Sequence, residues 1–216
     1  TGNILLVNLD AIKKFMIEKN VYHKLNDYIK ASGDLAVKLY KEDIEAALRT
    51  KDFGGFELLS LSDYTGQSTA TVGILDVFYE SKGLISHDEF KNFAGEAVPL
   101  FKAKRIFKNT DTLEAELDLY DFGEKKINNP VYNLTVQNGK QVFYKTSTTE
   151  SKVSIPLNSI TKSTMLSVIL EVNGYKNTWR IFVFAENKIE NNVRMIKSEE
   201  ELYDIIKNGG KAIVTK

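Results

Sequence analysis

The sequence predicts an α+β multidomain chain, in which a mostly helical segment is followed by a β-sandwich and a short βαβ tail. Three observations predict this order. Apolar residues recur at helical spacing over residues 1–97, and apolar and polar residues alternate with period two over residues 98–185. A capped helical stretch between two short apolar runs then occupies residues 186–216. We expect these three ranges to be the domains of the chain.

The composition supports folded domains and excludes two classes of partner. Hydrophobic residues make up 43% of the 216 residues, which is enough for sizeable cores. Twenty-nine basic residues balance 29 acidic ones, so the net charge of zero gives no electrostatic attraction to nucleic acid or to an anionic membrane. No apolar run approaches the roughly 18 residues that span a bilayer. We therefore expect neither nucleic acid nor a membrane as a partner.

The chain also lacks the residues of the common metal and phosphate sites. It contains no cysteine and two histidines, which excludes disulfides and thiolate chemistry and argues against a transition-metal site. The glycine pairs at 54–55 and 209–210 lack the spacing of phosphate-binding loops. We expect no metal and no cofactor. The missing cysteines are compatible with an exported protein and with a cytosolic one.

The first segment is predicted to be helical until about residue 50. Asn8 is placed to cap a helix whose apolar face comprises Leu9, Ile12, Phe15 and Met16. A second helical stretch surrounds residues 25–29, and a longer helix is expected after Gly33, with apolar residues at helical spacing from 35 to 48.

One strand is predicted in this half, at residues 55–61, where paired glycines end the helix and an apolar run follows. A polar loop at 62–67 and a short helix around 75–79 come next, and Ser86 with Glu89 forms a capping box for a further helix. This order is the unit of a parallel α/β sheet, whose strands need neighbours on both edges. A lone strand has two unpaired edges. We therefore expect the chain to be a fragment that either self-associates through strand 55–61 or packs this strand against non-native neighbours.

Six or seven short strands are expected in the second segment, which favours an immunoglobulin-like sandwich without the disulfide of antibody domains. Tight-turn signals at Asn138-Gly139 and Asn173-Gly174 separate pairs of them. The alternating stretches are residues 113–119, 131–136, 141–144, 153–157, 165–172 and 179–184. In the tail, a capped helix at 198–206 lies between predicted strands at 193–196 and 211–214, which together make a βαβ unit.

The candidate binding residues are Asp63, Tyr64 and Gln67, in the loop after the predicted strand. Ligand-binding residues gather at the carboxyl ends of parallel strands, so these side chains are candidates for contacting a hydroxyl-rich ligand. The alternative is a solvated loop with a turn organised by Asp63. The carboxylate group at residues 42–45 is interpreted as a solvated helix face, and no catalytic residue is expected.

Two stretches resemble a known enzyme family. They are residues 31–50 and residues 53–76, and the most specific part is the run GFELLSLSDYTGQ at 55–67. Together they resemble the last strand and flanking helices of the (β/α)8 barrel in bacterial family-two, β-galactosidase-like glycoside hydrolases. The passage through Val98, Pro99 and Leu100 into a sandwich also resembles these proteins.

The resemblance covers roughly residues 1–185, and it implies that the helical segment is the final quarter of a barrel with residues 55–61 as strand eight. Relatives carry the general acid on strand four and the nucleophile on strand seven, both of which would precede Thr1. It implies a non-catalytic segment of a secreted or periplasmic enzyme that acts on O-glycosidic bonds, with carbohydrate as the partner of the intact protein. Whether this chain is itself an enzyme stays uncertain at this point.

Two alternatives remain open. One is a binding module, in which the sandwich contacts carbohydrate through exposed aromatic residues. Trp179, Phe182 and Phe184 are the candidates for stacking on a sugar, although at least two of them are expected in the sandwich core. The other is a structural or interaction protein that dimerises through its lone strand.

Overall fold

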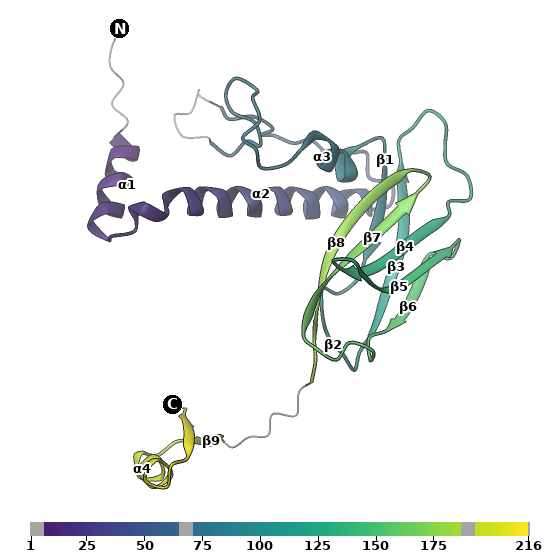
Figure 1. Cartoon of the computed structure of the whole chain (residues 1–216). Helices are drawn as coiled ribbons and strands as arrows, with labels where there is room; N and C mark the ends of the chain where they lie inside the picture. The colour runs from purple at the N-terminus through teal and green to yellow at the C-terminus, as the bar shows by residue number, and fades with distance from the viewer. Residues whose placement is uncertain (1–6, 65–70, 187–192, 216) are drawn as a thin grey trace.

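The computed structural model describes residues 7–64, 71–186 and 193–215. It is a mixed α+β structure, as predicted: helices dominate the N-terminal part, strands dominate the middle, and a small βαβ unit follows (Figure 1). The helices and the short 3-10 turn are α1 (Val7–Glu18), η1 (Tyr22–Lys24), α2 (Leu25–Leu48), α3 (His87–Ala94) and α4 (Glu199–Lys207).

Two sheets pack face to face around one apolar core and form a β-sandwich. The smaller sheet has the order β1-β3-β6 and the larger has the order β2-β8-β7-β4-β5. Their strands are β1 (Ala97–Lys102), β2 (Ile106–Lys108), β3 (Thr112–Asp121), β4 (Tyr132–Asn138), β5 (Gln141–Thr148), β6 (Lys152–Pro156), β7 (Thr164–Val172) and β8 (Tyr175–Phe184). Alternate residues of β3, β4, β7 and β8 point into the shared core, so the period-two pattern has its expected cause.

The turns of the sandwich form where the sequence predicts them. Asn173 and Gly174 both have positive φ, at 49° and 89°, which is the backbone of the tight turn that joins β7 to β8. The β4–β5 connection contains Gly139 at φ 55°. Two strands were not predicted, β1 and β2. β1 is buried along almost its whole length and therefore carries no alternation, and β2 has only three residues.

The helix α2 is longer than predicted, because it runs without a break through Gly33. A Cβ atom at this position would lie 2.4 Å from Cδ2 of Leu84, so the glycine allows the later segment to pack closely on the helix. The glycine is thus a packing residue, and the prediction that the long helix starts after it was wrong.

The prediction of a strand at residues 55–61 is wrong. These residues form no strand, and within the described part of the chain no neighbouring strand is available to accept their backbone hydrogen bonds. Leu59 is 94% exposed. The helix predicted around 75–79 is also absent, since residues 75–81 form a turn flanked by single bridges. Self-association through residues 55–61 stays a prediction.

The C-terminal unit consists of β9 (Val193–Ile196), α4 and β10 (Lys211–Val214), with the two strands paired in parallel. Ser198 caps α4 by accepting a hydrogen bond from the backbone N–H of Glu201, as predicted. Ile196 is the buried residue of the unit, whereas Met195 and its cross-strand neighbour Ile213 are exposed.

Candidate functional site

The loop that carries the predicted binding residues is organised around Asp63. Its Oδ1 atom accepts hydrogen bonds from the backbone N–H of Gly73 at 2.9 Å and from Nζ of Lys82 at 2.6 Å. The carboxylate is largely buried, with a side-chain exposure of 9%. Asp63 therefore ties together three parts of the chain, through partners 10 and 19 residues away rather than through the local turn of the alternative interpretation.

Three short segments, residues 61–63, 73–76 and 80–82, meet at this point, and we call them the loop core. Leu75 forms a parallel bridge with Ser62 and an antiparallel bridge with Ser81. The approach is close enough that a Cβ atom at Gly73 would lie 2.4 Å from the backbone N of Asp63. Glycine is required here, because any side chain would push the segments apart.

The structure separates the three predicted binding residues. Tyr64 follows Asp63 directly and is 59% exposed. Gln67 lies outside the described residues. Asp63 and Tyr64 are thus neighbours with different surroundings, one held in an ion pair and the other open to solvent.

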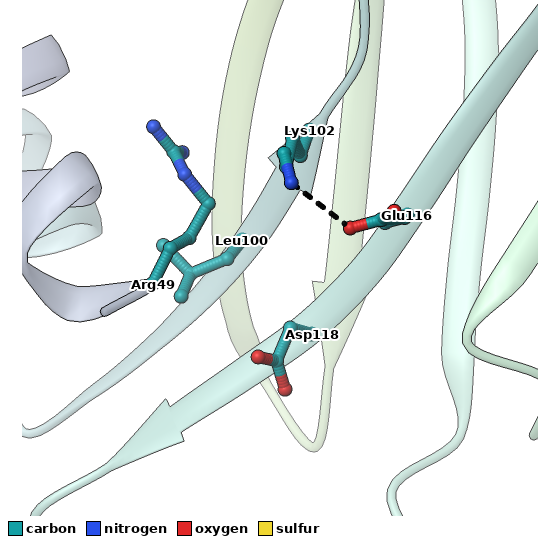
Figure 2. Close-up of a pocket in the computed structure, with 5 residues that line it drawn as sticks. All are labelled: Arg49, Leu100, Lys102, Glu116 and Asp118. Carbon is teal, nitrogen blue, oxygen red and sulfur yellow. Dashed lines mark hydrogen bonds and ion pairs between the residues drawn. The ribbon is translucent and has the colours of Figure 1, made fainter. Parts of the chain in front are cut away.

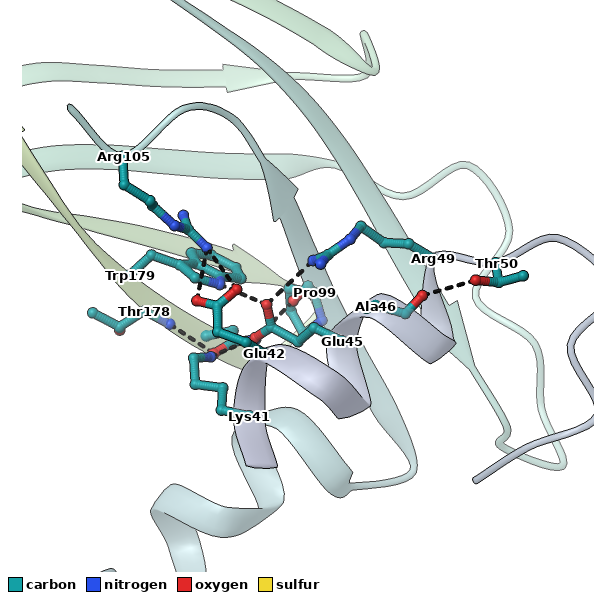
Figure 3. Close-up of polar contacts among 11 residues, drawn as sticks. Lys41, Glu42, Glu45, Ala46, Arg49, Thr50, Pro99, Arg105, Thr178 and Trp179 are labelled. Atoms are coloured by element: carbon teal, nitrogen blue, oxygen red, sulfur yellow. Dashed lines mark hydrogen bonds and ion pairs between the residues drawn. The ribbon is translucent and has the colours of Figure 1, made fainter. Parts of the chain in front are cut away.

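A second polar site lies where the end of α2 meets β1 and β8 (Figure 3). Its centre is Glu45, which is fully buried. The carboxylate accepts hydrogen bonds from Nε1 of Trp179 at 2.8 Å and from Nδ2 of Asn177 at 2.8 Å. It is also paired with two cations of its own helix, Lys41 and Arg49, one turn before and one turn after. We call these five residues the polar junction.

Asn177, Lys41 and Trp179 have further partners besides Glu45. Nδ2 of Asn177 donates to the carbonyl oxygen of Pro99 in β1 at 3.0 Å, and Nζ of Lys41 donates to Oδ1 of Asn177. The same Nζ lies 4.8 Å from the ring centroid of Trp179. Burial lowers the pKa of Lys41, and the charge of Glu45 opposes this shift.

The polar junction is arranged for attachment rather than for catalysis. All the oxygen atoms of Glu45 face donors from the protein itself, so the carboxylate is not free to accept a proton from a substrate. Its partners come from the helical half and from the sandwich, and it joins the two. An exposed pair between Glu42 and Arg105, at 3.1 Å, extends this attachment.

The sequence pattern predicts a solvated face at residues 42–45 and does not predict this role. The prediction holds for Glu42 and is wrong for Glu45. Glu45 lies on the same side of the helix as the buried residues Ile44 and Leu48. The spacing of Lys41, Glu45 and Arg49 beside that apolar stripe was the signal that could have identified it.

A small pocket lies between the end of α2 and strands β1 and β3 (Figure 2). Its lining residues are Arg49, Leu100, Lys102, Glu116 and Asp118. Lys102 and Glu116 pair across it at 3.4 Å. Two cations and two carboxylates leave no net charge to attract an ion, so we assign no ligand to this pocket.

Within residues 7–64, 71–186 and 193–215, no three His, Asp or Glu side chains gather in a way that could hold a metal ion. Over the same ranges, none of the helices has the length and apolar character to span a membrane.

A family model described as a domain of unknown function, DUF8488, matches residues 111–185. This range begins beside β3 and ends just after β8, so it corresponds to most of the sandwich. No curated protein matches the chain.

Proposed function

We propose that this chain is the non-catalytic C-terminal segment of a β-galactosidase-like glycoside hydrolase that acts on O-glycosidic bonds of oligo- or polysaccharides. In this proposal the helical half is the end of a (β/α)8 barrel and the sandwich is its immunoglobulin-like companion domain. The parent enzyme is secreted or periplasmic, and carbohydrate is its partner. The chain supplies support to the barrel, and other strands supply the catalytic carboxylates.

The observation that carries the proposal is a set of apolar side chains that α1 and α2 leave in solvent. We call this set the apolar helix face: each member is between 53% and 60% exposed, and the members are Leu9, Ile12, Phe15, Ile29, Leu35 and Leu39. Soluble proteins rarely leave so many large apolar side chains exposed on two consecutive helices without a partner. A barrel body that packs on both helices would bury them.

The polar junction supports the same interpretation. It fixes the last turns of α2 to the sandwich, through Glu45 on the helix and Asn177 and Trp179 on β8. The sandwich can therefore hold the helix at a set angle while the exposed part of the helix contacts another body. A companion domain of a barrel needs this kind of rigid attachment.

The unpaired segment at 55–61 has the same explanation. Residues 59–60 of this segment form a turn, Phe56 and Leu61 are about 40% exposed, and the segment leads into the polar loop at Asp63. As the last strand of a barrel it would pair on both edges and bury these side chains. Within the chain alone it has no such neighbours among the described residues.

The test compares the chain with the longer protein that its natural reading frame encodes. We expect no hydrolysis of aryl β-galactosides by the chain and clear hydrolysis by the longer protein. Turnover by the chain alone that disappears in Asp63→Asn would contradict the non-catalytic assignment. A reading frame without alternating strands and helices before Thr1 would contradict the barrel assignment.

A binding module is the second candidate function, and one observation favours it. Phe182 and Phe184 project outward from β8, contrary to the expectation that two of the three aromatic residues lie in the core, and only Trp179 is buried. Ile106 of β2 and Met165 of β7 pair with Phe182 across the sheet, so three exposed apolar side chains form one row. Such a row suits contact with a sugar or with a second copy.

Phe182→Ser tests this candidate, with Thr178→Ser on the same face of β8 as the control. If the row is a contact surface, Phe182→Ser weakens oligosaccharide binding or reduces the mass measured by light scattering, whereas Thr178→Ser changes neither. Unchanged binding and mass in Phe182→Ser would contradict the binding-module function.

A further inference from the structure

The polar junction holds one cation more than it has carboxylates. Lys41 and Arg49 both pair with the carboxylate of Glu45. The other two members of the junction are an asparagine and a tryptophan, which carry no charge. The neighbouring pair of Glu42 and Arg105 adds one charge of each sign and therefore leaves this excess unchanged. A positive charge is thus incompletely compensated where the helix α2 meets the sandwich (Figure 3).

Lys41 is the cation of the junction that can release this charge. A lysine ammonium can lose its proton when it is buried, whereas an arginine guanidinium keeps its proton in folded proteins. The side chain of Lys41 is 18% exposed. Its Nζ atom lies 4.8 Å from the ring centroid of Trp179 and 5.4 Å from that of Phe93. Aromatic rings attract a cation less strongly than the water that they displace, so these contacts leave part of the desolvation cost in place.

The charged groups that face Nζ of Lys41 come from two parts of the chain. They are Glu42 and Glu45 of α2, and Arg105 in the connection between β1 and β2. The side chains with which α3 and β8 contact this atom carry no charge, and they are Phe93, Asn177 and Trp179. Burial lowers the pKa of Lys41, the charge of Arg105 acts in the same direction, and the two carboxylates oppose the shift without cancelling it.

A lysine with a lowered pKa in the folded chain makes stability depend on pH. Between the lowered pKa and the ordinary lysine pKa, the unfolded chain binds more protons than the folded chain. The free energy of unfolding therefore rises as the pH rises through the lowered pKa, and it levels off above the ordinary value. The same linkage applies to any local opening that lifts α2 from the sandwich, because such an opening returns Lys41 to water.

We propose that Lys41 makes the attachment of α2 to the sandwich pH-dependent: the attachment is looser while Lys41 is charged and tighter once it has lost its proton. Glu45 keeps Arg49 and its two donors from β8 in either state, so the attachment persists and its strength changes. This inference goes beyond the proposed function, because it concerns the seating of α2 and is independent of the body that covers the apolar helix face.

NMR of the lysine side-chain amines of the full chain, recorded from pH 7 to pH 11, measures the titration directly. We expect Lys41 to lose its proton at a lower pH than Lys38, an exposed lysine three residues earlier on the same helix. The comparison removes effects that act on every lysine of the chain, such as salt and temperature. A midpoint of Lys41 at or above that of Lys38 would overturn the proposal.

Urea unfolding followed by the fluorescence of Trp179 measures the consequence between pH 7 and pH 10. At pH 7 we expect a higher urea midpoint for Lys41→Met than for wild type, because methionine fills a similar volume without a charge. The gap should shrink toward pH 10, where wild type has lost the proton. Lys38→Met is the matched control, and its difference from wild type should be the same at every pH.

Hydrogen exchange at pH 7 places the effect in the structure. Amides of residues 44–49 should exchange more slowly in Lys41→Met than in wild type, and Lys38→Met should match wild type. A urea gap that is independent of pH, or exchange in Lys41→Met that is unchanged or faster, would overturn the proposal. If Lys41→Met does not fold, Lys41→Gln takes its place and the same results decide. Turnover and the longer protein enter none of these measurements, so their failure leaves the proposed function standing.

Discussion

Glu45 shows how one residue can join two parts of a chain. Burying a carboxylate away from solvent costs free energy unless opposite charges and hydrogen bonds compensate for the lost hydration. Here Lys41 and Arg49 supply the charges, and Asn177 and Trp179 supply donors from the sandwich. The compensation exists only when α2 is seated in one position, so the junction specifies that position as well as contributing stability.

We predict that Glu45→Gln destabilises the chain by about 3 kcal/mol, because two partly buried cations lose their counter-charge. Urea unfolding followed by tryptophan fluorescence measures the change, since Trp179 is the single tryptophan and lies at the junction. Glu42→Gln is the matched control, because its pair with Arg105 is solvent-exposed and worth less than about 1 kcal/mol. Equal losses in the two variants would show that burial of Glu45 is unimportant.

At the scale of single elements, α3 has the most complete cap in the structure. Oγ of Ser86 accepts from the backbone N–H of Glu89, and the carboxylate of Glu89 accepts from the backbone N–H of Ser86. These hydrogen bonds from Ser86 lower the pKa of Glu89 below its usual value. The helix then positions Phe93, which packs with Ile44, Leu48, Val98 and Leu100 beside the junction.

Ser86→Ala should cost about 1 kcal/mol near neutral pH. Because the folded-state pKa of Glu89 is lowered, the stabilisation from its carboxylate is full above the ordinary carboxyl pKa and is lost as the pH falls through the lowered value. The stability difference between wild type and Ser86→Ala should therefore shrink on acidification. Urea midpoints measured from pH 7 down to pH 3 test this, and a difference that grows toward low pH would contradict it.

The elements of the sandwich could be predicted because their signals are local. Alternation along β3, β7 and β8 reflects one buried and one exposed face, and Asn173-Gly174 specifies its turn without help from the rest of the chain. β4 and β5 begin within one residue of the predicted starts at 131 and 141, but β5 runs to Thr148, past its predicted end at 144.

The helical half was predicted less well because its signals depend on distant partners. Residues 55–61 have the composition of a strand, but a strand forms only where a neighbour accepts its hydrogen bonds. Gly33 has the appearance of a helix boundary in the sequence, but in the structure it lies inside α2 and makes room for Leu84. Around residue 76, an aspartate that bonds to nearby backbone groups replaced the predicted helix with a turn.

The difference between local signals and distant contacts also explains which residues of the candidate site could be predicted from the sequence. Asp63 and Tyr64 could be identified because polar residues after an apolar run indicate a loop of interest. The spacing of Lys41, Glu45 and Arg49 could have indicated that Glu45 is paired, but its partners in the sandwich, Asn177 and Trp179, could not be predicted, since they lie more than 130 residues away in sequence. No local pattern reports such contacts.

At the scale of the whole molecule, the two halves differ in how they are stabilised. The sandwich buries a continuous core that includes Leu134, Leu166, Leu170 and Ile181, each with 0% exposure. Over most of α1 and the first half of α2, apolar side chains stay in solvent. Since burial of apolar area is the main source of stability, α1 and the first half of α2 should open independently of the sandwich, and far more often.

Hydrogen exchange of the full chain, followed by mass spectrometry, tests this central claim most directly. We predict that amides in α1 and in residues 53–61 exchange at nearly unprotected rates, while those of β7 and β8 exchange only on global unfolding. In the longer parent protein, α1 should become protected as the apolar helix face is buried. Protection of α1 in the chain alone that equals the protection of β7 would contradict the account, because the helical half would then need no further partner.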